Sequence, residues 1–215
     1  MSENIITVTN VSKHFKEETV LKDVTVAFEK GKIHGIIGRN GSGKTMLFKC
    51  ICGFVPPSEG EIVVNGKRIG KDVDIPESVG IIIETPGFLP NYSGYNNLRL
   101  LASINHKIKK EDIISAIKNV GLDPDSKKHV RKYSLGMRQR LGIAQAIMEN
   151  PEILIFDEPM NGLDNTGVKE IREILKGLKN EGKTIIIASH NSEDIKELCD
   201  TVCEMDAGKL TELKN

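Results

Sequence analysis

The sequence lacks the charge imbalance that marks several classes of protein. Of its 215 residues, 30 are Lys or Arg and 30 are Asp or Glu, so the formal net charge is zero. A nucleic-acid-binding protein usually carries a basic excess, because neutralising phosphates drives its affinity. The run Lys127–Lys132 is locally basic, and we interpret it as a solvated surface before a helix. We therefore expect no nucleic-acid partner.

Long hydrophobic runs are also missing. The longest, such as Thr184–Ala188, fall far short of the roughly 20 apolar residues that cross a bilayer. The first residues, Met1–Asn4, lack the basic and apolar regions of a signal peptide. We expect a cytoplasmic chain that reaches a membrane only through other subunits.

Cysteine is scarce, and its spacing does not suggest a metal site. The four cysteines fall as Cys50/Cys52 and Cys199/Cys203, and neither pair has the C-x-x-C spacing of a zinc ligand set. Free cysteine is among the residues most often buried. We expect reduced, buried thiols and no metal bound by them.

Strand-like and helix-like segments alternate along most of the chain, which favours an α/β fold with a mainly parallel sheet. Between Ser93 and Met148 the apolar residues recur at helical spacing instead, so this third predicts a helical insertion. Strands are expected at 4–10, 20–28, 33–37, 61–67, 79–83, 152–156, 184–188 and 201–206, and further helices at 46–52, 166–179 and 191–198.

The segment Gly38–Thr45 fits the phosphate-binding pattern G-x-x-x-x-G-K-[ST] between an apolar strand and a helix. Glycines let backbone N–H groups converge on phosphates, and the helix N-terminus adds a favourable dipole. Lys44 can reach the β- and γ-phosphates, and the Thr45 hydroxyl can ligate Mg²⁺. The predicted nucleotide-binding residues are Gly38, Arg39, Asn40, Gly41, Ser42, Gly43, Lys44 and Thr45.

A second motif, Ile153–Glu158, is a buried strand that ends in two carboxylates. Open α/β sheets bind ligands at the carboxyl ends of their strands. We expect Asp157 to hold Mg²⁺, directly or through water, and Glu158 to polarise the attacking water.

Between these motifs, Tyr133–Arg140 reads Tyr-Ser-Leu-Gly-Met-Arg-Gln-Arg. With both motifs in place, the sequence resembles the ATP-binding cassette (ABC) ATPases over nearly its whole length. The segment looks like the ABC signature, usually Leu-Ser-Gly-Gly-Gln; Ser134 and Gly136 keep that form, whereas Leu135 and Met137 depart from it. The resemblance implies that Ser134 and Gly136 contact ATP held by another copy. Taken alone, the segment would be an ordinary Ser-capped helix start.

Weaker matches follow in the family's order. Asn161–Asp164 occupies the D-loop position, and His190, after the strand 184–188, occupies the switch-histidine position. Phe15 stands where the family places an aromatic ring that stacks on adenine; a core residue is the alternative. The resemblance thus adds His190 to Lys44 and Glu158 as catalytic residues.

Glu84 is the informative departure from the family pattern, which has Gln at the start of the loop after strand 79–83. Glu keeps an acceptor oxygen for Mg²⁺ or water but loses the amide donor and adds charge. The replacement is similar to that in ATPases of lantibiotic-immunity and bacitracin-resistance exporters. Neutral drift is the alternative.

The resemblance implies a P-loop NTPase fold: a RecA-like, mainly parallel core with an N-terminal antiparallel β subdomain and an inserted α-helical subdomain. We expect one ABC domain over residues 1–215. The core with its β subdomain would take about 1–92 and 150–215, and the helical subdomain about 93–149.

The implied function is an ATPase subunit, using ATP and Mg²⁺, of an exporter of antimicrobial peptides or similar compounds. Two copies would pair head to tail around ATP, and membrane permeases on separate chains would dock near residues 84–100. An importer ATPase shares all the chemistry, with Glu84 weighing against it. A non-transport ABC protein acting on DNA or the ribosome is disfavoured, because the interval from Lys44 to Ser134 leaves no room for a long coiled coil and the chain holds one cassette. The transported compound, and whether the dimer pairs identical chains, stay open.

Overall fold

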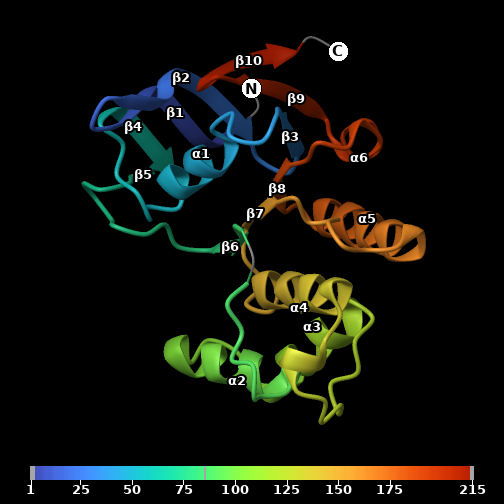
Figure 1. Cartoon of the computed structure of the whole chain (residues 1–215). Helices are drawn as coiled ribbons and strands as arrows, with labels where there is room; N and C mark the ends of the chain where they lie inside the picture. Colours follow the sequence, from blue (N-terminus) through green and yellow to red (C-terminus); the bar gives the residue numbers. More distant parts are fainter. Residues whose placement is uncertain (1–2, 85, 214–215) are drawn as a thin grey trace.

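The computed structural model describes residues 3–84 and 86–213, which form two β-sheets and a separate group of helices (Figure 1). The smaller sheet is antiparallel, with the order β2-β1-β4-β5. Its strands are β1 (Asn4–Phe15), β2 (Glu18–Glu29), β4 (Glu59–Val64) and β5 (Lys67–Arg68).

The larger sheet has the order β10-β9-β3-β8-β7-β6 and is parallel except for the β9–β10 pair. The central strands β3, β7 and β8 are short, rich in Ile and buried almost throughout, as expected of parallel strands covered on both faces. The strands are β3 (Ile33–Ile37), β6 (Val79–Ile82), β7 (Ile153–Asp157), β8 (Thr184–Ala188), β9 (Thr201–Asp206) and β10 (Lys209–Leu213).

Alternating side chains of the larger sheet feed two hydrophobic cores. Ile155 and Ile186 join the core formed with α1 (Lys44–Ile51) and the antiparallel sheet. Leu154 and Ile187 point to the opposite core, which includes α5 (Asn165–Asn180). A last short helix, α6 (Ser192–Leu198), contacts α5 and β3. The sheet is therefore the middle layer of the molecule.

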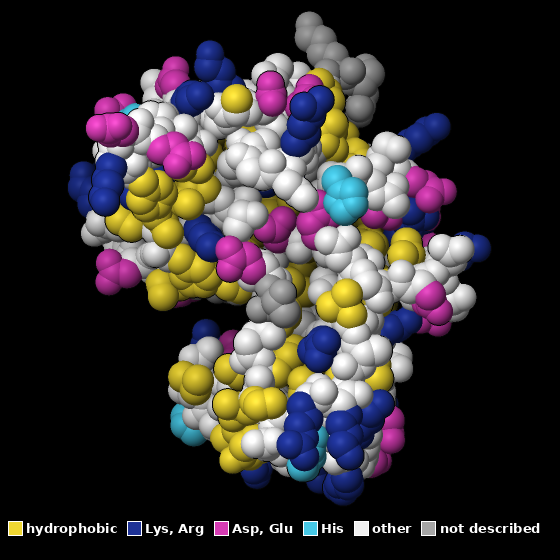
Figure 2. Space-filling model, viewed as in Figure 1, with side chains coloured by type: hydrophobic (Ala, Val, Ile, Leu, Met, Phe, Trp, Pro, Cys, Tyr) yellow, Lys and Arg dark blue, Asp and Glu magenta, His cyan; other side chains and the backbone are white. Residues whose placement is uncertain are grey.

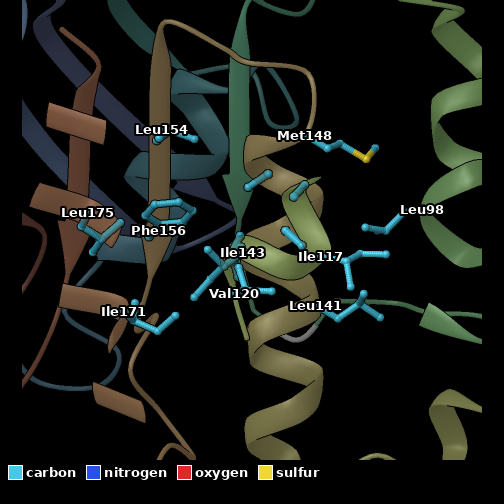
Figure 3. Packing of buried hydrophobic residues seen from close by; sticks show 14 of the residues in the cluster. Leu98, Ile117, Val120, Leu141, Ile143, Met148, Leu154, Phe156, Ile171 and Leu175 are labelled. Carbon is cyan, nitrogen blue, oxygen red and sulfur yellow. The ribbon is translucent and has the colours of Figure 1, made fainter. Parts of the chain in front are cut away.

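The remaining helices lie between β6 and β7 in the sequence and form the lower part of Figure 1. They are α2 (Gly94–Asn105), α3 (Lys110–Asn119), a 3₁₀ turn (Val130–Lys132) and α4 (Leu135–Ile147). Figure 3 shows their shared core with the sheet, with Leu154 and Phe156 of β7 on one side and Ile117 and Leu98 on the other. A Cβ on Gly80 would lie 2.0 Å from the Ala146 carbonyl oxygen, so only glycine lets β6 approach α4 this closely.

The expected fold class is confirmed, and most expected segments occur within one or two residues of their predicted ends. The first two strands are longer than predicted, because their antiparallel pairing continues to Phe15 and Glu18 around a turn with positive φ at Lys16. Strand β10 was not predicted, because its sequence Lys-Leu-Thr-Glu-Leu is short and mostly exposed. Within the described residues, no helix is both long and apolar enough to span a membrane.

The cysteines behave as expected of core residues. Three are buried, Cys199 is partly buried, and all four are free. Burial raises the pKa of the Cys50 and Cys203 thiols to about 11, and that of the Cys52 and Cys199 thiols to about 12. They therefore stay protonated and unreactive at neutral pH.

Candidate nucleotide-binding site

Four neighbouring strands of the larger sheet deliver most of the predicted site residues. In spatial order, β3, β8, β7 and β6 lead into the loops that hold Gly38–Thr45, His190, Glu158 and Glu84. Because these strands are parallel, their carboxyl ends lie at one edge of the sheet, where α/β folds bind ligands. The topology thus gathers residues that are far apart in the sequence.

The loop Gly38–Thr45 has the backbone conformation that its glycines predict. Gly38 and Gly43 have φ values of 151° and 116°, which other residues rarely adopt. A Cβ on Gly38 would lie 2.2 Å from the Met205 carbonyl oxygen, so the loop packs directly on β9. Helix α1 begins at Lys44, and its first N–H groups therefore border the loop, as in a phosphate-binding site.

Lys44 and Ser42 are buried polar side chains that lack a full set of partners. The Lys44 ammonium donates to the carbonyl oxygens of Gly38 and Arg39, at 2.7 and 3.1 Å, and only 6% of the residue is exposed. The Ser42 hydroxyl is buried and has no hydrogen bond within the described residues. An anion with several acceptor oxygens would give both groups the partners that they lack. Arg39, Asn40 and Gly41 form the exposed rim of the loop.

Thr45 and Asp157 meet at the foot of this loop. The Thr45 hydroxyl donates to Asp157 Oδ2 at 2.6 Å, which joins the start of α1 to the end of β7. A hydroxyl and a carboxylate are oxygen donors of the kind that Mg²⁺ prefers. The pair therefore fits a magnesium ion bound beside phosphates.

Glu158 and His190 form the second contact at this edge. His190 Nδ1 lies 2.8 Å from Glu158 Oε2, while Glu158 Oε1 is buried and has no hydrogen-bond partner among the described residues. Glu158 also has φ of 54°, a sparsely populated conformation that often marks functional sites. A carboxylate with one oxygen held and the other unpartnered is suited to accept a hydrogen bond from water.

Glu84 does not join this group directly. Its Oε1 lies 2.7 Å from the Lys49 ammonium, one helical turn beyond Thr45 on α1, and 63% of its side chain is exposed. Thr45 and Asp157 bond to each other rather than to Glu84. The structure thus separates Glu84 from the other two predicted metal ligands by an ion pair that the sequence did not predict.

Phe15 and the signature residues lie outside the contact network described so far. Phe15, at the end of β1, is 45% exposed, with the Lys13 ammonium 4.9 Å from its ring centre. That exposure argues against a core role and leaves the ring available for stacking. Ser134 is exposed and caps α4 by accepting a hydrogen bond from the Met137 N–H at 3.2 Å.

Gly136 lies against the D-loop segment rather than the phosphate loop, since a Cβ there would be 2.9 Å from the Gly162 carbonyl oxygen. One further side chain links this region to the candidate site. Gln139 of α4 is buried and donates to the Glu158 carbonyl oxygen at 3.3 Å. Sequence reasoning missed Gln139, although a polar residue among the apolar positions of α4 was a usable signal.

The fold and these contacts define a P-loop nucleotide-binding domain. Comparison with known proteins gives the family: the profile described as ABC transporter matches residues 21–161. The chain belongs to the ATP-binding proteins of ABC transporters and is an ATPase of that family. The resemblance predicted from the sequence is confirmed.

Three curated relatives cover almost the whole chain. It is 47% identical to the uncharacterized ABC transporter ATP-binding protein YybJ of Bacillus subtilis, over 96% of this chain and 94% of that one. It is 42% identical to the bacitracin transport ATP-binding protein BcrA of Enterococcus faecalis, over 99% and 70%. It is 35% identical to the lantibiotic transport ATP-binding protein SrtF of Streptococcus pyogenes, over 96% and 89%.

The fold is also that of a solved cassette. A bacterial ABC transporter cassette, determined as a dimer, superposes with a TM-score of 0.87 over 98% of this chain and 99% of the other. The two are 24% identical, so this likeness bears on the fold alone.

Proposed function

We propose that this chain hydrolyses ATP at the Gly38–Thr45 edge and powers the export of antimicrobial peptides or similar compounds through separate permease subunits. The observation that carries the hydrolytic part is the state of Glu158. One of its oxygens contacts His190, and the other is buried without a partner in the described part of the chain. The loop that carries Ser42, Lys44 and Thr45 precedes and begins α1 at the same edge of the sheet, which supports phosphate binding there.

In this proposal the chain's own residues bind the phosphates of ATP and orient and polarise the attacking water. Lys44 and the loop N–H groups hold the β- and γ-phosphates, and the Oε1 atom of Glu158 accepts a hydrogen bond from water. The water oxygen attacks the γ-phosphorus, and the bond between the γ-phosphorus and the β–γ bridging oxygen breaks. The products are ADP, phosphate and a proton. His190 holds Glu158 and faces the γ-phosphate. Mg²⁺, when held by Thr45 and Asp157, neutralises charge on the phosphates.

A second cassette completes the site in this proposal. Ser134 is exposed at the start of α4, and Gly136 packs against the Gly162 carbonyl oxygen, which leaves the Ser134 hydroxyl accessible to a second chain. Head-to-tail pairing would place them on ATP held by the other copy, whose adenine stacks on Phe15. ATP then favours the closed dimer because it contacts both faces, and hydrolysis removes the γ-phosphate bridge.

The permease surface is proposed at the boundary between the sheet and the helices, near residues 84–100. At the same boundary, just outside residues 84–100, a groove of about 740 Å³ is lined by Ile75–Ile81 and by the C-terminal ends of α2 and α4. Figure 2 shows the molecule hollowed between its two parts, with apolar side chains along both edges. Large exposed apolar side chains near this boundary are Ile75, Leu89, Tyr92, Leu100 and Ile104. Thr85, within the proposed segment, lies outside the described residues.

The peptide substrate rests on the relatives and on Glu84. Two similar proteins are named for bacitracin and lantibiotic transport. An importer ATPase would use the same site residues, so the catalytic geometry does not distinguish the two directions. A transported peptide antibiotic is the substrate class that the relatives favour.

Lys44→Ala tests the nucleotide site. Because the buried ammonium faces the proposed β- and γ-phosphates, its loss should weaken ATP binding by about tenfold or more. Titration with a fluorescent ATP analogue measures this, and Lys118→Ala, at an exposed lysine of α3, is the control. Unchanged affinity in Lys44→Ala would mean that the loop does not hold phosphates. The transport part is tested by bacitracin and lantibiotic resistance in cells carrying the chain with its permeases, against cells carrying Lys44→Ala.

A further inference from the structure

A buried ion pair joins α5 to α6 behind the candidate site. Arg172 of α5 has 6% of its side chain exposed, and Asp194 of α6 has 2%. Two N–H groups of its guanidinium, on Nε and Nη2, donate to the same Asp194 oxygen, Oδ1, at 2.9 and 2.6 Å. Glu193 and Glu197 approach the same guanidinium from its exposed rim.

Stability alone is a weak reason for this arrangement. Burying a guanidinium and a carboxylate carries a large desolvation penalty, and apolar residues of similar volume often stabilise such a site as well or better. The informative feature is the second carboxylate oxygen. Because Arg172 uses only Oδ1, Oδ2 of Asp194 remains available to another donor.

That donor is the residue before the switch-histidine position. The Ser189 hydroxyl donates to Asp194 Oδ2 at 3.3 Å and accepts the Asn191 N–H at 3.1 Å. One hydroxyl therefore ties down the backbone on both sides of His190. The His190 side chain itself is 62% exposed, and its contact with Glu158 depends on where this backbone holds it.

Helix α5 carries the connection further. It begins at the D-loop, where Asp164 caps it by accepting the Gly167 N–H at 2.8 Å. Arg172 lies about two turns along the same helix. One helix thus begins at the D-loop and carries, near its middle, the arginine that binds Asp194 beneath the His190 loop.

We propose that Arg172 and Asp194 are positioning residues for ATP hydrolysis: through Ser189 they hold the Ser189–Asn191 backbone so that His190 contacts Glu158. The inference rests on the proposed function, since it assumes that His190 and Glu158 act on ATP. Neither Arg172 nor Asp194 touches the nucleotide in this arrangement, so the pair acts only through the loop.

The main test replaces the pair by apolar residues, Arg172→Met with Asp194→Leu, in the full chain. Removing both charges avoids leaving one of them buried and uncompensated, so the thermal midpoint should stay within a few degrees of wild type. Ser189 loses its acceptor, and kcat for phosphate release should fall about tenfold or more, because small misplacements of catalytic groups are costly. KM for ATP should stay within about twofold, since the phosphate loop is untouched.

A matched control exists on the same helices. Lys176 also joins α5 to α6, through Glu197 at 2.9 Å, but lies at the surface and has no contact with Ser189. Lys176→Met should leave kcat within about twofold. If the double replacement does not fold, Ser189→Ala removes only the hydroxyl link, and the same fall in kcat with unchanged KM is expected from it.

Combining the pair replacement with His190→Ala distinguishes a positioning role from a general loss of structure, because the effects of residues that act through one another do not add. In a chain that already carries His190→Ala, replacing the pair should lower the residual rate by less than about twofold, because the pair has no other route to the chemistry. A further tenfold loss in that background, or wild-type kcat after the pair or Ser189 is replaced, would overturn the inference. Wild-type kcat in His190→Ala alone would instead overturn the proposed role of His190.

Discussion

The loops after β6 and β7 hold two glutamates in almost the same backbone setting but in different surroundings. Glu84 and Glu158 follow neighbouring parallel strands and have φ values of 61° and 54°. The exposed side-chain fraction is 63% for Glu84 and 19% for Glu158. Glu84 is paired with an ammonium, whereas Glu158 contacts an imidazole and keeps one buried oxygen unpartnered within the described residues.

The two glutamates therefore differ in environment rather than in residue type or backbone conformation, and we expect that environment to decide which of them is sensitive to substitution. A carboxylate shielded from water interacts strongly with whatever approaches it, because the effective dielectric is low. An exposed ion pair is screened and contributes little. The loop after β7 should therefore tolerate almost no change, and the loop after β6 should tolerate several.

Glu158→Gln, in the loop after β7, should lower the ATPase rate more than any other substitution considered below. The amide keeps the size but cannot act as a base, so the rate of phosphate release should fall about a hundredfold or more while ATP binding persists. With ATP bound and not consumed, the variant should accumulate as a closed dimer, which size-exclusion chromatography with Mg-ATP detects. Glu152→Gln, at an exposed glutamate before β7, is the control. Wild-type turnover by Glu158→Gln would remove Glu158 from the proposed role.

The sequence predicted the positions of β7 and of the phosphate loop well, because their signals are local. An apolar strand ending in Asp157 and Glu158, and a glycine-rich segment ending in Lys44 and Thr45, are each contiguous. Each also has a physical reason for its spacing. The same holds for β8, whose predicted bounds match the structure, and for the helical third of the chain.

What the sequence could not predict is where side chains from distant segments meet. Lys49 reads as an ordinary helix residue, and only the fold brings it to Glu84. Arg172 and Asp194 read as two members of charged helices, and their burial depends on how α5 packs on α6. Patterns of hydrophobicity place helices and strands, but they do not specify which charged side chain turns inward.

Lys49→Met removes the ion-pair partner of Glu84, in the loop after β6, and should have a moderate effect on KM for ATP. Without the ammonium, the Glu84 carboxylate becomes an uncompensated negative charge beside α1, the helix that begins at the phosphate loop, and it should repel ATP. Since 63% of the Glu84 side chain is exposed and its charge is screened, we expect KM for ATP to rise about two- to fivefold, with kcat nearly unchanged. Phosphate release at varied ATP concentration measures this, and the effect should shrink in high salt.

The double variant Lys49→Met/Glu84→Gln is the internal control for that result. Removing the carboxylate as well should return KM to near the wild-type value, because the repulsive charge is gone. A KM that stays raised in the double variant would assign the effect to Lys49 alone, and an unchanged KM in Lys49→Met would mean that the ion pair has no bearing on ATP.

Glu84→Gln alone should have the smallest effect on the chain's own ATPase. The amide oxygen of glutamine can still accept a hydrogen bond from Lys49, so kcat and KM should stay within about twofold of wild type. The change removes one charge from an exposed position beside the proposed permease surface. If the permease contacts the Glu84 carboxylate, the substitution should weaken the coupling between hydrolysis and transport and leave the basal rate of hydrolysis unchanged.

The size of that coupling effect follows from exposure. A contact of this kind is worth a few kcal/mol when desolvated and less than about 1 kcal/mol when exposed. With 63% of its side chain exposed, Glu84 lies toward the lower limit, so resistance should fall about fivefold at most. The comparison is peptide resistance alongside ATPase rate in cells carrying the complete transporter with glutamate or glutamine at this position. Equal resistance with both residues would show that the Glu84 charge has no effect on transport. The proposal that the transporter exports peptides would then rest on the relatives alone.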